Sequence, residues 1–280
     1  MIGRASPTRS VRVARHRDGA VRREKDSLAV EEPLEIRVVW GERADRTVSQ
    51  IAVTMRTPGD DFELVAGFLS GEGIIDSTHE LDELTYCRSG ESQEYNIVEA
   101  RLRPGVPFDV ERMRRNVFTS SSCGVCGKAS LEAVEAVGCS TLTDTFEVEG
   151  ALLASLPDKL LEGQGVFART GGLHAAGLFE GDGKLIALHE DVGRHNAVDK
   201  VLGRSFLAGS LPADERVLVV SGRASFEIIQ KALMARVPVL VAVGAPSSLA
   251  VELADQFGQT LLGFARNGGF NVYCGHRRVL

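Results

Sequence analysis

Residues 216–265 have the sequence RVLVVSGRASFEIIQKALMARVPVLVAVGAPSSLAVELADQFGQTLLGFA, and their pattern decides the fold class. Apolar runs at Arg216–Val220, Val237–Val243 and Thr260–Ala265 alternate with helical patterns at Phe226–Ala235 and Ser248–Phe257. Continuous apolar strands that alternate with helices are typical of a parallel sheet covered on both faces. The segment therefore predicts an α/β domain.

The residues around this segment extend the same domain. Helical patterns occur at Cys123–Val137, Leu152–Glu162 and Asn196–Leu207, and strand patterns at Gly165–Arg169, Leu185–Glu190 and Phe270–Tyr273. We assign residues 116–280 to this domain.

A smaller unit precedes it. Strand patterns at Leu34–Val39, Ser49–Met55, Glu80–Arg88 and Glu94–Leu102 flank a helical pattern at Asp61–Ser70. This order predicts a small ββαββ, α+β domain over residues 28–115.

Composition and charge limit the classes of protein that fit. The 280 residues are 44% hydrophobic, and five cysteines cannot all pair, which favours free thiols in a reducing compartment. Residues 1–27 hold eight basic and three acidic residues, whereas the rest holds 24 basic and 35 acidic ones. We expect a disordered basic arm over 1–27 and an acidic body that does not bind nucleic acid.

The chain is expected to be cytoplasmic and not bound to a membrane. Residues 1–27 lack the apolar run of a secretory signal. The longest later apolar run, Val237–Ala245, is far shorter than the roughly 20 residues that cross a bilayer.

The most reactive feature in the sequence is the run Cys123-Gly124-Val125-Cys126-Gly127-Lys128, which opens a predicted helix. The dipole of a helix N-terminus and a nearby lysine both favour the thiolate form of a cysteine. Zinc binding, disulfide exchange, sulfur transfer through a persulfide and a purely structural role are all open to such a pair. No second C-x-x-C accompanies it, so we expect no metal held by protein ligands.

Two loops that follow predicted strands are suited to anions. Ser221-Gly222-Arg223-Ala224-Ser225 and Gly244-Ala245-Pro246-Ser247-Ser248 each open a helix. Hydroxyl groups, a guanidinium and free backbone N–H groups at helix N-termini bind phosphate. Both loops lie where open α/β sheets bind ligands, so together they indicate a nucleotide-like ligand.

Polar residues also gather around Gly-containing turns at Arg169–His174 and His189–Asn196. Loops that follow strands commonly carry binding residues. We therefore include His174 and His195 among the candidate site residues.

With these residues in view, the sequence resembles the formate dehydrogenase accessory sulfurtransferase family, FdhD. The resemblance extends from Ala29 to the end of the chain and rests on an ordered series of motifs. These are Glu31–Leu34, Met55–Asp61, Cys123–Lys128, Thr170–His174, Glu190–Ala197, Ser221–Phe226 and Ala245–Ser248.

The resemblance implies a sulfurtransferase that works through a persulfide. It would carry sulfur from a cysteine desulfurase to bis-molybdopterin guanine dinucleotide, the molybdenum cofactor of formate dehydrogenase, which it binds as a substrate and which GDP-like nucleotides would mimic. It also implies a homodimer and a three-layer C-terminal domain similar to the cytidine deaminase fold. The alternatives are a dithiol/disulfide oxidoreductase and a cofactor-binding chaperone without sulfur transfer.

The resemblance also assigns roles to residues. The persulfide would form on Cys123, with Cys126 in support. A cofactor-binding stretch would lie at Phe264, Ala265, Arg266, Asn267, Gly268 and Gly269. With the loops and histidines above, the remaining predicted cofactor-binding residues are Ser221, Gly222, Arg223, Ser225, His174, His195 and Ser247.

Overall fold

The computed structural model describes residues 6–87, 95–108, 138–143 and 145–280, and the larger of its sheets has six strands. The order across this sheet is β12-β11-β10-β9-β7-β8. Its strands are β7 (His174–Glu180), β8 (Leu185–Asp191), β9 (Arg216–Val220), β10 (Val239–Ala242), β11 (Thr260–Arg266) and β12 (Gly269–Cys274).

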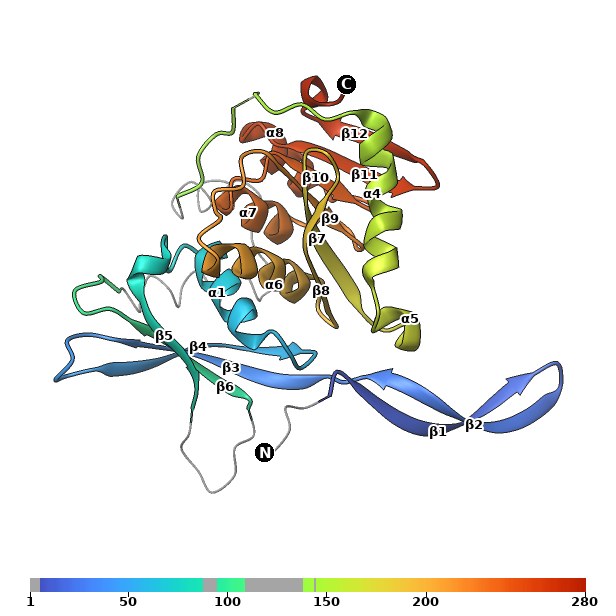
Figure 1. Cartoon of the computed structure of the whole chain (residues 1–280), viewed down its shortest axis with the longest axis horizontal. Coiled ribbons are helices and arrows are strands. Elements are labelled where there is room, and N and C mark those ends of the chain that lie inside the picture. Colours follow the sequence, from blue (N-terminus) through green and yellow to red (C-terminus); the bar gives the residue numbers. More distant parts are fainter. Residues whose placement is uncertain (1–5, 88–94, 109–137, 144) are drawn as a thin grey trace.

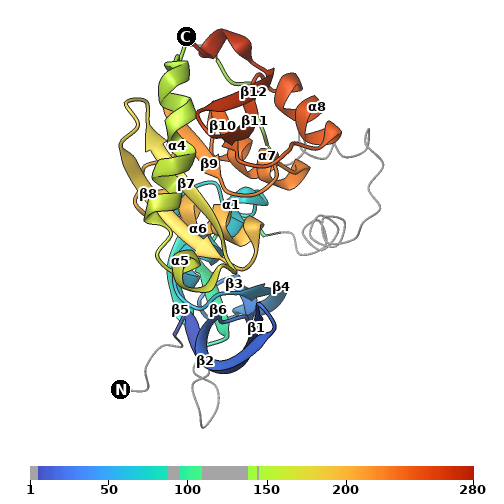
Figure 2. The same ribbon diagram turned by 90° about the vertical axis from the view of Figure 1, so that its right-hand side faces the viewer.

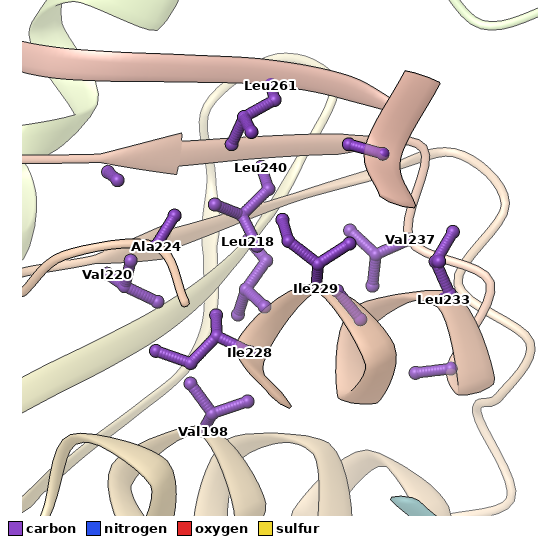
Figure 3. Close-up of a cluster of buried hydrophobic side chains, with 14 of the residues drawn as sticks. Val198, Leu218, Val220, Ala224, Ile228, Ile229, Leu233, Val237, Leu240 and Leu261 are labelled. Atoms are coloured by element: carbon purple, nitrogen blue, oxygen red, sulfur yellow. The ribbon is translucent and has the colours of Figure 1, made fainter. Parts of the chain in front are cut away.

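Helices cover both faces of this sheet, as the sequence predicts. One face carries α4 (Gly150–Gly163), and the other carries α6 (Arg194–Leu207), α7 (Phe226–Met234) and α8 (Ser248–Gln256) (Figures 1 and 2). Figure 3 shows the core beneath α7, where Ile228 and Ile229 pack with Leu218 and Leu240 of the central strands. The three-layer arrangement is present, and its likeness to the cytidine deaminase fold stays a prediction.

The sheet is mixed and not purely parallel. Only β9, β10 and β11 run parallel, whereas β7, β8 and β12 are antiparallel to their neighbours. Short turns explain the difference, because strands joined by a few residues can pair only as antiparallel hairpins. Asn267-Gly268 joins β11 to β12 in this way.

A short helix replaces one predicted strand. We expected a strand at Gly165–Arg169, but the chain forms α5 (Phe167–Thr170), and the strand β7 comes later. The carboxylate of Glu190 accepts hydrogen bonds from the backbone N–H groups of Val166 and Phe167, at 2.9 and 2.6 Å. This contact from a distant strand satisfies the donors of the helical turn and overrides local strand propensity.

The predicted ββαββ unit is confirmed. Its four-stranded sheet has the order β4-β3-β6-β5 and packs one face on α1. The elements are β3 (Glu32–Trp40), β4 (Thr47–Arg56), α1 (Asp61–Gly71), β5 (Leu81–Tyr86) and β6 (Ile97–Leu102). The predicted domain boundary near residue 115 and the predicted helix Cys123–Val137 lie outside the described residues.

The two sheets are joined through a close crossing of α1 and α6, which lie between them (Figure 1). Gly67 of α1 and Gly203 of α6 make this approach possible. A Cβ atom on Gly203 would collide with the carbonyl oxygen of Glu63, and one on Gly67 with that of Asp199. The backbones of the two helices therefore touch directly.

The basic arm differs from the expected disorder over residues 8–27. β1 (Thr8–Arg17) and β2 (Ala20–Ala29) form an antiparallel hairpin that projects from the body (Figure 1). Asp18 and Gly19 connect them with positive φ angles of 51° and 75°, a combination that favours Asp-Gly in two-residue hairpin turns. The charge of the segment suggested disorder, but this turn signal indicates the hairpin.

No helix within the described parts of the chain is long and apolar enough to cross a membrane.

Candidate functional site

One edge of the six-stranded sheet brings the predicted loops together. Backbone hydrogen bonds of 3.0 Å link the two loops to each other and to β11. Gly244 N, after β10, donates to Gly222 O, after β9, and Phe264 N of β11 donates to Gly244 O. β7 starts at the same edge, because Ala176 pairs with Val220. His174 therefore lies beside the loops that sequence analysis assigned to anion binding.

Gly244 allows these loops to approach one another. A Cβ atom on Gly244 would lie 2.9 Å from the carbonyl oxygen of Gly222 and 3.0 Å from the backbone nitrogen of Arg223. Real Cβ atoms do not come so close to backbone, so a side chain at position 244 would push the loops apart. Ala224 and Pro246 complete the link with a β-bridge.

A pocket of about 590 Å³ opens at this edge. His174, Ser221, Ala265, Arg266 and Asn267 line it, so it unites residues that the sequence places far apart. Its other walls are mainly apolar and come from α4, α5 and the Gly171–Leu173 turn. This volume and this mixture of apolar walls with a few polar groups are typical of small-molecule sites.

The end of β11 and the turn that follows it have an unusual backbone conformation beside the pocket. Phe264, Asn267 and Gly268 have φ angles of 53°, 54° and 73°. A bulky residue such as Phe264 rarely adopts positive φ, and such strain concentrates at binding sites. The Phe264 ring is 40% exposed and lies 5.9 Å from the Arg266 guanidinium. Arg266 lines the pocket, whereas Phe264 does not, so the exposed ring lies outside the pocket.

His174 and His195 lie at the same edge, and both are held in the neutral form. Burial is the main cause that lowers the pKa of each histidine, and for His195 the pKa falls to about 4. The positive charge of nearby Arg194 lowers both further. His195 Nε2 lies 3.1 Å from the Ser225 hydroxyl, which ties the start of α6 to the loop before α7.

Arg194 is a site residue that the sequence analysis did not select. Arg194 and His174 both lie next to Gly222. A Cβ atom built on Gly222 would be 3.7 Å from Cβ and Cδ of Arg194 and 3.5 Å from Nδ1 of His174. The buried Nε of Arg194 has no hydrogen-bond acceptor among the described residues. The sequence did indicate this residue, because Arg194 lies within the polar run His189–Asn196.

Several predicted residues lie apart from the pocket. Ser247 caps α8, where its hydroxyl accepts a hydrogen bond from Ala250 N at 3.3 Å, and its side chain does not line the pocket. Gly268 lies in the turn and Gly269 begins β12. Other predicted residues that do not line the pocket are Phe264, Gly222, Arg223, Ser225 and His195. Cys123 and Cys126 lie outside the described residues.

The remaining cysteines are poor nucleophiles or have polar contacts elsewhere. Burial raises the pKa of the Cys139 thiol to about 12 and that of Cys274 to about 11. Cys87 Sγ lies 3.9 Å from Arg37 Nη1 on the small domain. Within the described ranges, no group of three His, Cys, Asp or Glu side chains is placed to hold a metal ion.

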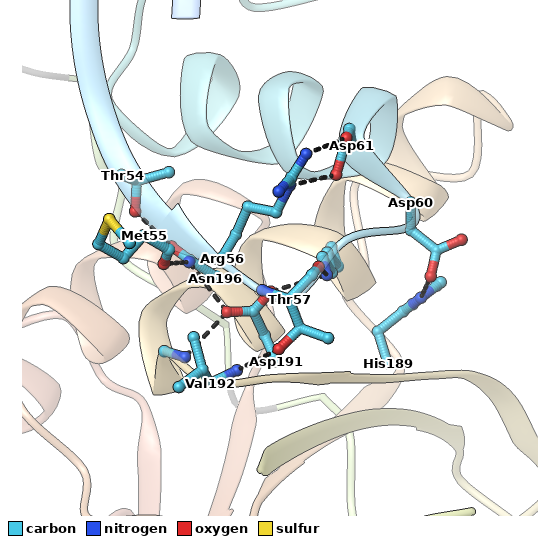
Figure 4. Close-up of polar contacts among 12 residues, drawn as sticks. Thr54, Met55, Arg56, Thr57, Asp60, Asp61, His189, Asp191, Val192 and Asn196 are labelled. Carbon is cyan, nitrogen blue, oxygen red and sulfur yellow. Dashed lines mark hydrogen bonds and ion pairs between the residues drawn. The ribbon is translucent and has the colours of Figure 1, made fainter. Parts of the chain in front are cut away.

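Much of the polar run His189–Asn196 serves structure and not the pocket. Asp191 is fully buried, and its carboxylate accepts hydrogen bonds from Thr57 N, Gly193 N and Asn196 Nδ2 (Figure 4). Lys200 Nζ lies 2.7 Å from Asp191 Oδ2 and donates to the Thr57 carbonyl at 2.9 Å. This network, which we call the Asp191 joint, fastens the start of α6 to the segment between β4 and α1.

A neighbouring ion pair orders the other side of that segment. Arg56 forms two hydrogen bonds of 3.0 Å with the Asp61 carboxylate, and both side chains are buried (Figure 4). The Tyr86 hydroxyl donates to the same carboxylate at 3.1 Å. Together with the contacts of Thr57 in the Asp191 joint, this ion pair gives the motif Met55–Asp61 a structural role between the two units. The residues of the motif do not line the pocket.

Fold and site define an α/β protein that joins a ββαββ unit to a three-layer unit, with a pocket at the carboxyl ends of its parallel strands. The FdhD/NarQ family matches residues 29–280, and the chain belongs to that family. The match begins at the last residue of β2, so nearly all of the hairpin arm lies outside it.

Named relatives agree with this membership. The sulfur carrier protein FdhD of Streptomyces avermitilis is 52% identical over 283 residues, which cover 99% of this chain and 97% of the relative. The protein of the same name from Mycobacterium tuberculosis is 50% identical, with 91% and 92% covered. A crystal structure described as a putative formate dehydrogenase accessory protein from Desulfotalea psychrophila superposes with a TM-score of 0.74 at 25% identity, covering 98% of this chain and all of that one.

Proposed function

We propose that this protein is a sulfurtransferase that carries sulfur to the molybdenum cofactor of formate dehydrogenase. The observation that carries the proposal is the pocket that unites His174, Ser221 and Ala265–Asn267 in a chain whose relatives are named sulfur carrier proteins. The substrate would be bis-molybdopterin guanine dinucleotide, bound in the pocket while sulfur is delivered.

The chemistry of the sheet edge supports a nucleotide as the ligand. The guanidinium group of Arg266 lines the pocket, and that of Arg223 lies in the adjoining loop before α7; both favour phosphate. The exposed ring of Phe264 offers a surface on which a base can stack. The pocket volume of about 590 Å³ lies in the range of small-molecule sites.

Sulfur transfer is assigned to Cys123. Its thiolate would attack the outer sulfur of a cysteine desulfurase persulfide, which breaks the donor's S–S bond and releases the donor thiolate. Cys123 then holds the sulfur as a persulfide, and Cys126 supports its delivery. The raised pKa values of Cys139 and Cys274 favour this assignment, because the thiolate is the reactive form.

The location, oligomeric state and partners of the protein are proposed on the same grounds. The protein would act in the cytoplasm as a homodimer, receive sulfur from a cysteine desulfurase and serve formate dehydrogenase. Its larger domain would share the layer order of the cytidine deaminase fold. Like the persulfide, these statements rest on family membership and on the residue chemistry above.

GDP binding tests the pocket half of the proposal. We expect Arg266→Ala to weaken GDP binding about tenfold, because one charge-assisted hydrogen bond to phosphate is lost. Arg101→Ala, on the outer face of the small sheet, is the matched control and should leave the affinity unchanged. Calorimetric titration measures both. Equal affinity of Arg266→Ala and the unaltered protein would remove the pocket assignment.

The rival functions make different predictions for Cys123→Ala. A chaperone that only holds the cofactor would support full formate dehydrogenase activity in cells with this variant, whereas a sulfurtransferase would not. A dithiol oxidoreductase would reduce protein disulfides catalytically. Formate dehydrogenase activity in complemented cells and an insulin reduction assay separate the three classes.

A further inference from the structure

Arginines in the body of the protein are usually paired with an acceptor. Among the described residues after the arm, six arginines form ion pairs with carboxylates, as Arg56 does with Asp61. Four more donate hydrogen bonds to backbone carbonyl groups, as Arg216 does to Ser210. Carboxylates outnumber basic residues in this body, so acceptors are plentiful. A half-buried arginine without an acceptor is therefore an exception.

Three arginines at the pocket edge are unpaired. Arg194, Arg223 and Arg266 form no ion pair and no hydrogen bond with any residue that the structure describes. Arg223 and Arg266 are exposed and can be hydrated, whereas Arg194 is half-buried and its Nε is shielded from water. Such a shielded donor without an acceptor is unfavourable. A bound anion would supply the acceptor that Arg194 lacks.

The three side chains come from segments that meet at one place. Arg194 lies next to Gly222, and Arg223 lies next to Gly244, where a Cβ atom would be 3.0 Å from Arg223 Cγ. A backbone hydrogen bond of 3.0 Å joins the two glycines. Arg266 lines the pocket, into which the same edge opens. The fold thus gathers three guanidinium groups from α6, the loop before α7 and the end of β11.

Neighbouring side chains leave this positive charge uncompensated. His174 and His195 are uncharged at pH 7, because burial and Arg194 lower the pKa of each. Glu227, in the first turn of α7, is a carboxylate that faces Arg194 and His195. Its Oε2 lies 3.7 Å from His195 Nε2, and it forms no ion pair with Arg194. One carboxylate beside three guanidinium groups leaves the edge positive.

We propose that Arg194, Arg223 and Arg266, which we call the diphosphate clamp, bind the diphosphate of a nucleotide whose nucleoside lies in the pocket. A nucleoside diphosphate carries about three negative charges at pH 7, and guanidinium groups match phosphate oxygens with paired hydrogen bonds. Arg266 lines the pocket and Arg194 does not, so Arg194 is assigned to the terminal phosphate. The inference rests on the proposed function for the nucleotide, and adds Arg194, which that function does not use.

Titration calorimetry with guanosine, GMP and GDP tests the role of Arg194. Arg194→Gln should weaken GDP binding about tenfold, GMP binding much less and guanosine binding not at all. Arg194→Lys should restore part of the loss, because lysine keeps the charge without the planar fork. Arg204→Gln is the matched control, since Arg204 lies on the same helix with a side chain that is 64% exposed.

The three ligands separate binding from folding. Unchanged guanosine affinity in Arg194→Gln, with circular dichroism like that of the unaltered protein, shows that the pocket is intact. An equal loss for guanosine, GMP and GDP would assign Arg194 a structural role and overturn the proposal. An unchanged ratio of GDP to GMP affinity would overturn it as well.

Inorganic pyrophosphate provides a spectroscopic test that does not involve the nucleoside. At saturation, its charge should shift the Arg194 Nε–H signal in NMR and raise the pKa of His195. Arg204→Gln should keep the rise, and Arg194→Gln should lose most of it. The charged or titratable groups that face His195 are Arg194, His174, Glu227 and Lys231. An unmoved His195 pKa in the unaltered protein would place the anion elsewhere and contradict the clamp.

Sulfur loading distinguishes this inference from the proposed function. Loading of Cys123 by a cysteine desulfurase is followed by mass spectrometry in the same variants. If Cys123 accepts no sulfur but pyrophosphate and GDP bind through Arg194, only the proposed function fails. If Cys123 is loaded and GDP affinity does not depend on Arg194, only the diphosphate clamp fails.

Discussion

Burial and a neighbouring arginine set the charge state of the two histidines at the pocket edge. His195 is neutral at pH 7 because burial and the charge of Arg194 lower its pKa to about 4. The same two causes, in the same order, lower the pKa of His174. A neutral imidazole can both donate and accept a hydrogen bond, whereas its protonated form only donates. Arg194 therefore influences how the pocket edge can contact a ligand.

Replacing Arg194 tests this electrostatic link. Arg194→Gln should raise the pKa of both His195 and His174, while burial should keep each below the usual histidine value. Titration of the imidazole signals by NMR measures the two pKa values. Lys184→Gln, at the far β7–β8 turn, is the control and should change neither. Unchanged histidine pKa values in Arg194→Gln would contradict the account.

The lowered pKa of His195 also gives stability a pH dependence with a definite sign. Between pH 6.5 and about 4 the unfolded chain binds a proton at His195 that the folded chain does not. The contribution of His195 to the free energy of unfolding is therefore full above pH 6.5 and falls as the pH is lowered towards 4. Denaturant unfolding across this range should show a smaller decrease for His195→Gln than for the unaltered protein.

The Asp191 joint predicts a large cost for a single substitution. Lys200→Met leaves the Asp191 carboxylate buried without its cation, and breaking such a pair typically costs about 3–5 kcal/mol. Asp60→Asn is the matched control, because it alters the contact of His189 with Asp60 between the same segments, and the Asp60 side chain is 52% exposed. Its cost should stay below about 1 kcal/mol. Urea unfolding measures the loss in the free energy of unfolding for both variants. Similar losses would contradict a structural role for the joint.

At the scale of elements, the crossing of α1 and α6 holds the two domains together. Neither glycine has a positive φ, so the reason for glycine at positions 67 and 203 is space and not backbone conformation. Alanine favours a helix over glycine by about 1 kcal/mol, and a purely local account would predict stabilisation by substitution. The close approach predicts the opposite sign.

Gly203→Ala tests which effect is larger. We expect a loss of about 1–3 kcal/mol, because the new methyl group meets backbone of α1 that cannot move without separating the helices. Gly165→Ala serves as the control, since a Cβ there meets nothing within 4 Å. Thermal unfolding compares the two. A rise in melting temperature for Gly203→Ala would refute the close crossing.

The elements also show where sequence reasoning succeeds. The ββαββ order and the helices and strands from Arg194 to Cys274 were predictable, because their apolar patterns follow the helix and strand periods. The strand β7 and the helix α5 were not, since the carboxylate of Glu190, distant in sequence, fixes α5. The arm was predictable from Asp18-Gly19, although its composition favoured disorder.

Only part of the candidate site could be predicted, because local patterns do not record tertiary packing. Ser221 follows a strand pattern, and the topology places strand ends at one edge, whereas Arg266 was predicted only from the family resemblance. Side chains from α4 and α5 complete the pocket through tertiary packing that no local pattern records. Conversely, Asp191 and Asn196 looked like site residues but are buried in the joint, because polarity in a sequence does not distinguish a network from a ligand site.

At the scale of the whole molecule, three parts have separate tasks. The small domain and the Asp191 joint hold the start of α6, which carries Arg194 and His195, against the pocket edge. The larger domain provides the pocket. The arm contacts α5 at its base and extends into solvent (Figure 1).

The most direct test of this account is to locate the transferred sulfur. The protein is incubated with a cysteine desulfurase and cysteine, and its peptides are analysed by mass spectrometry without reductant. A persulfide adds one sulfur atom, about 32 Da, and we predict this adduct on Cys123 and its loss in Cys123→Ala. An adduct on Cys87, Cys139 or Cys274 that persists in Cys123→Ala, or no adduct at all, would contradict sulfur transfer through Cys123.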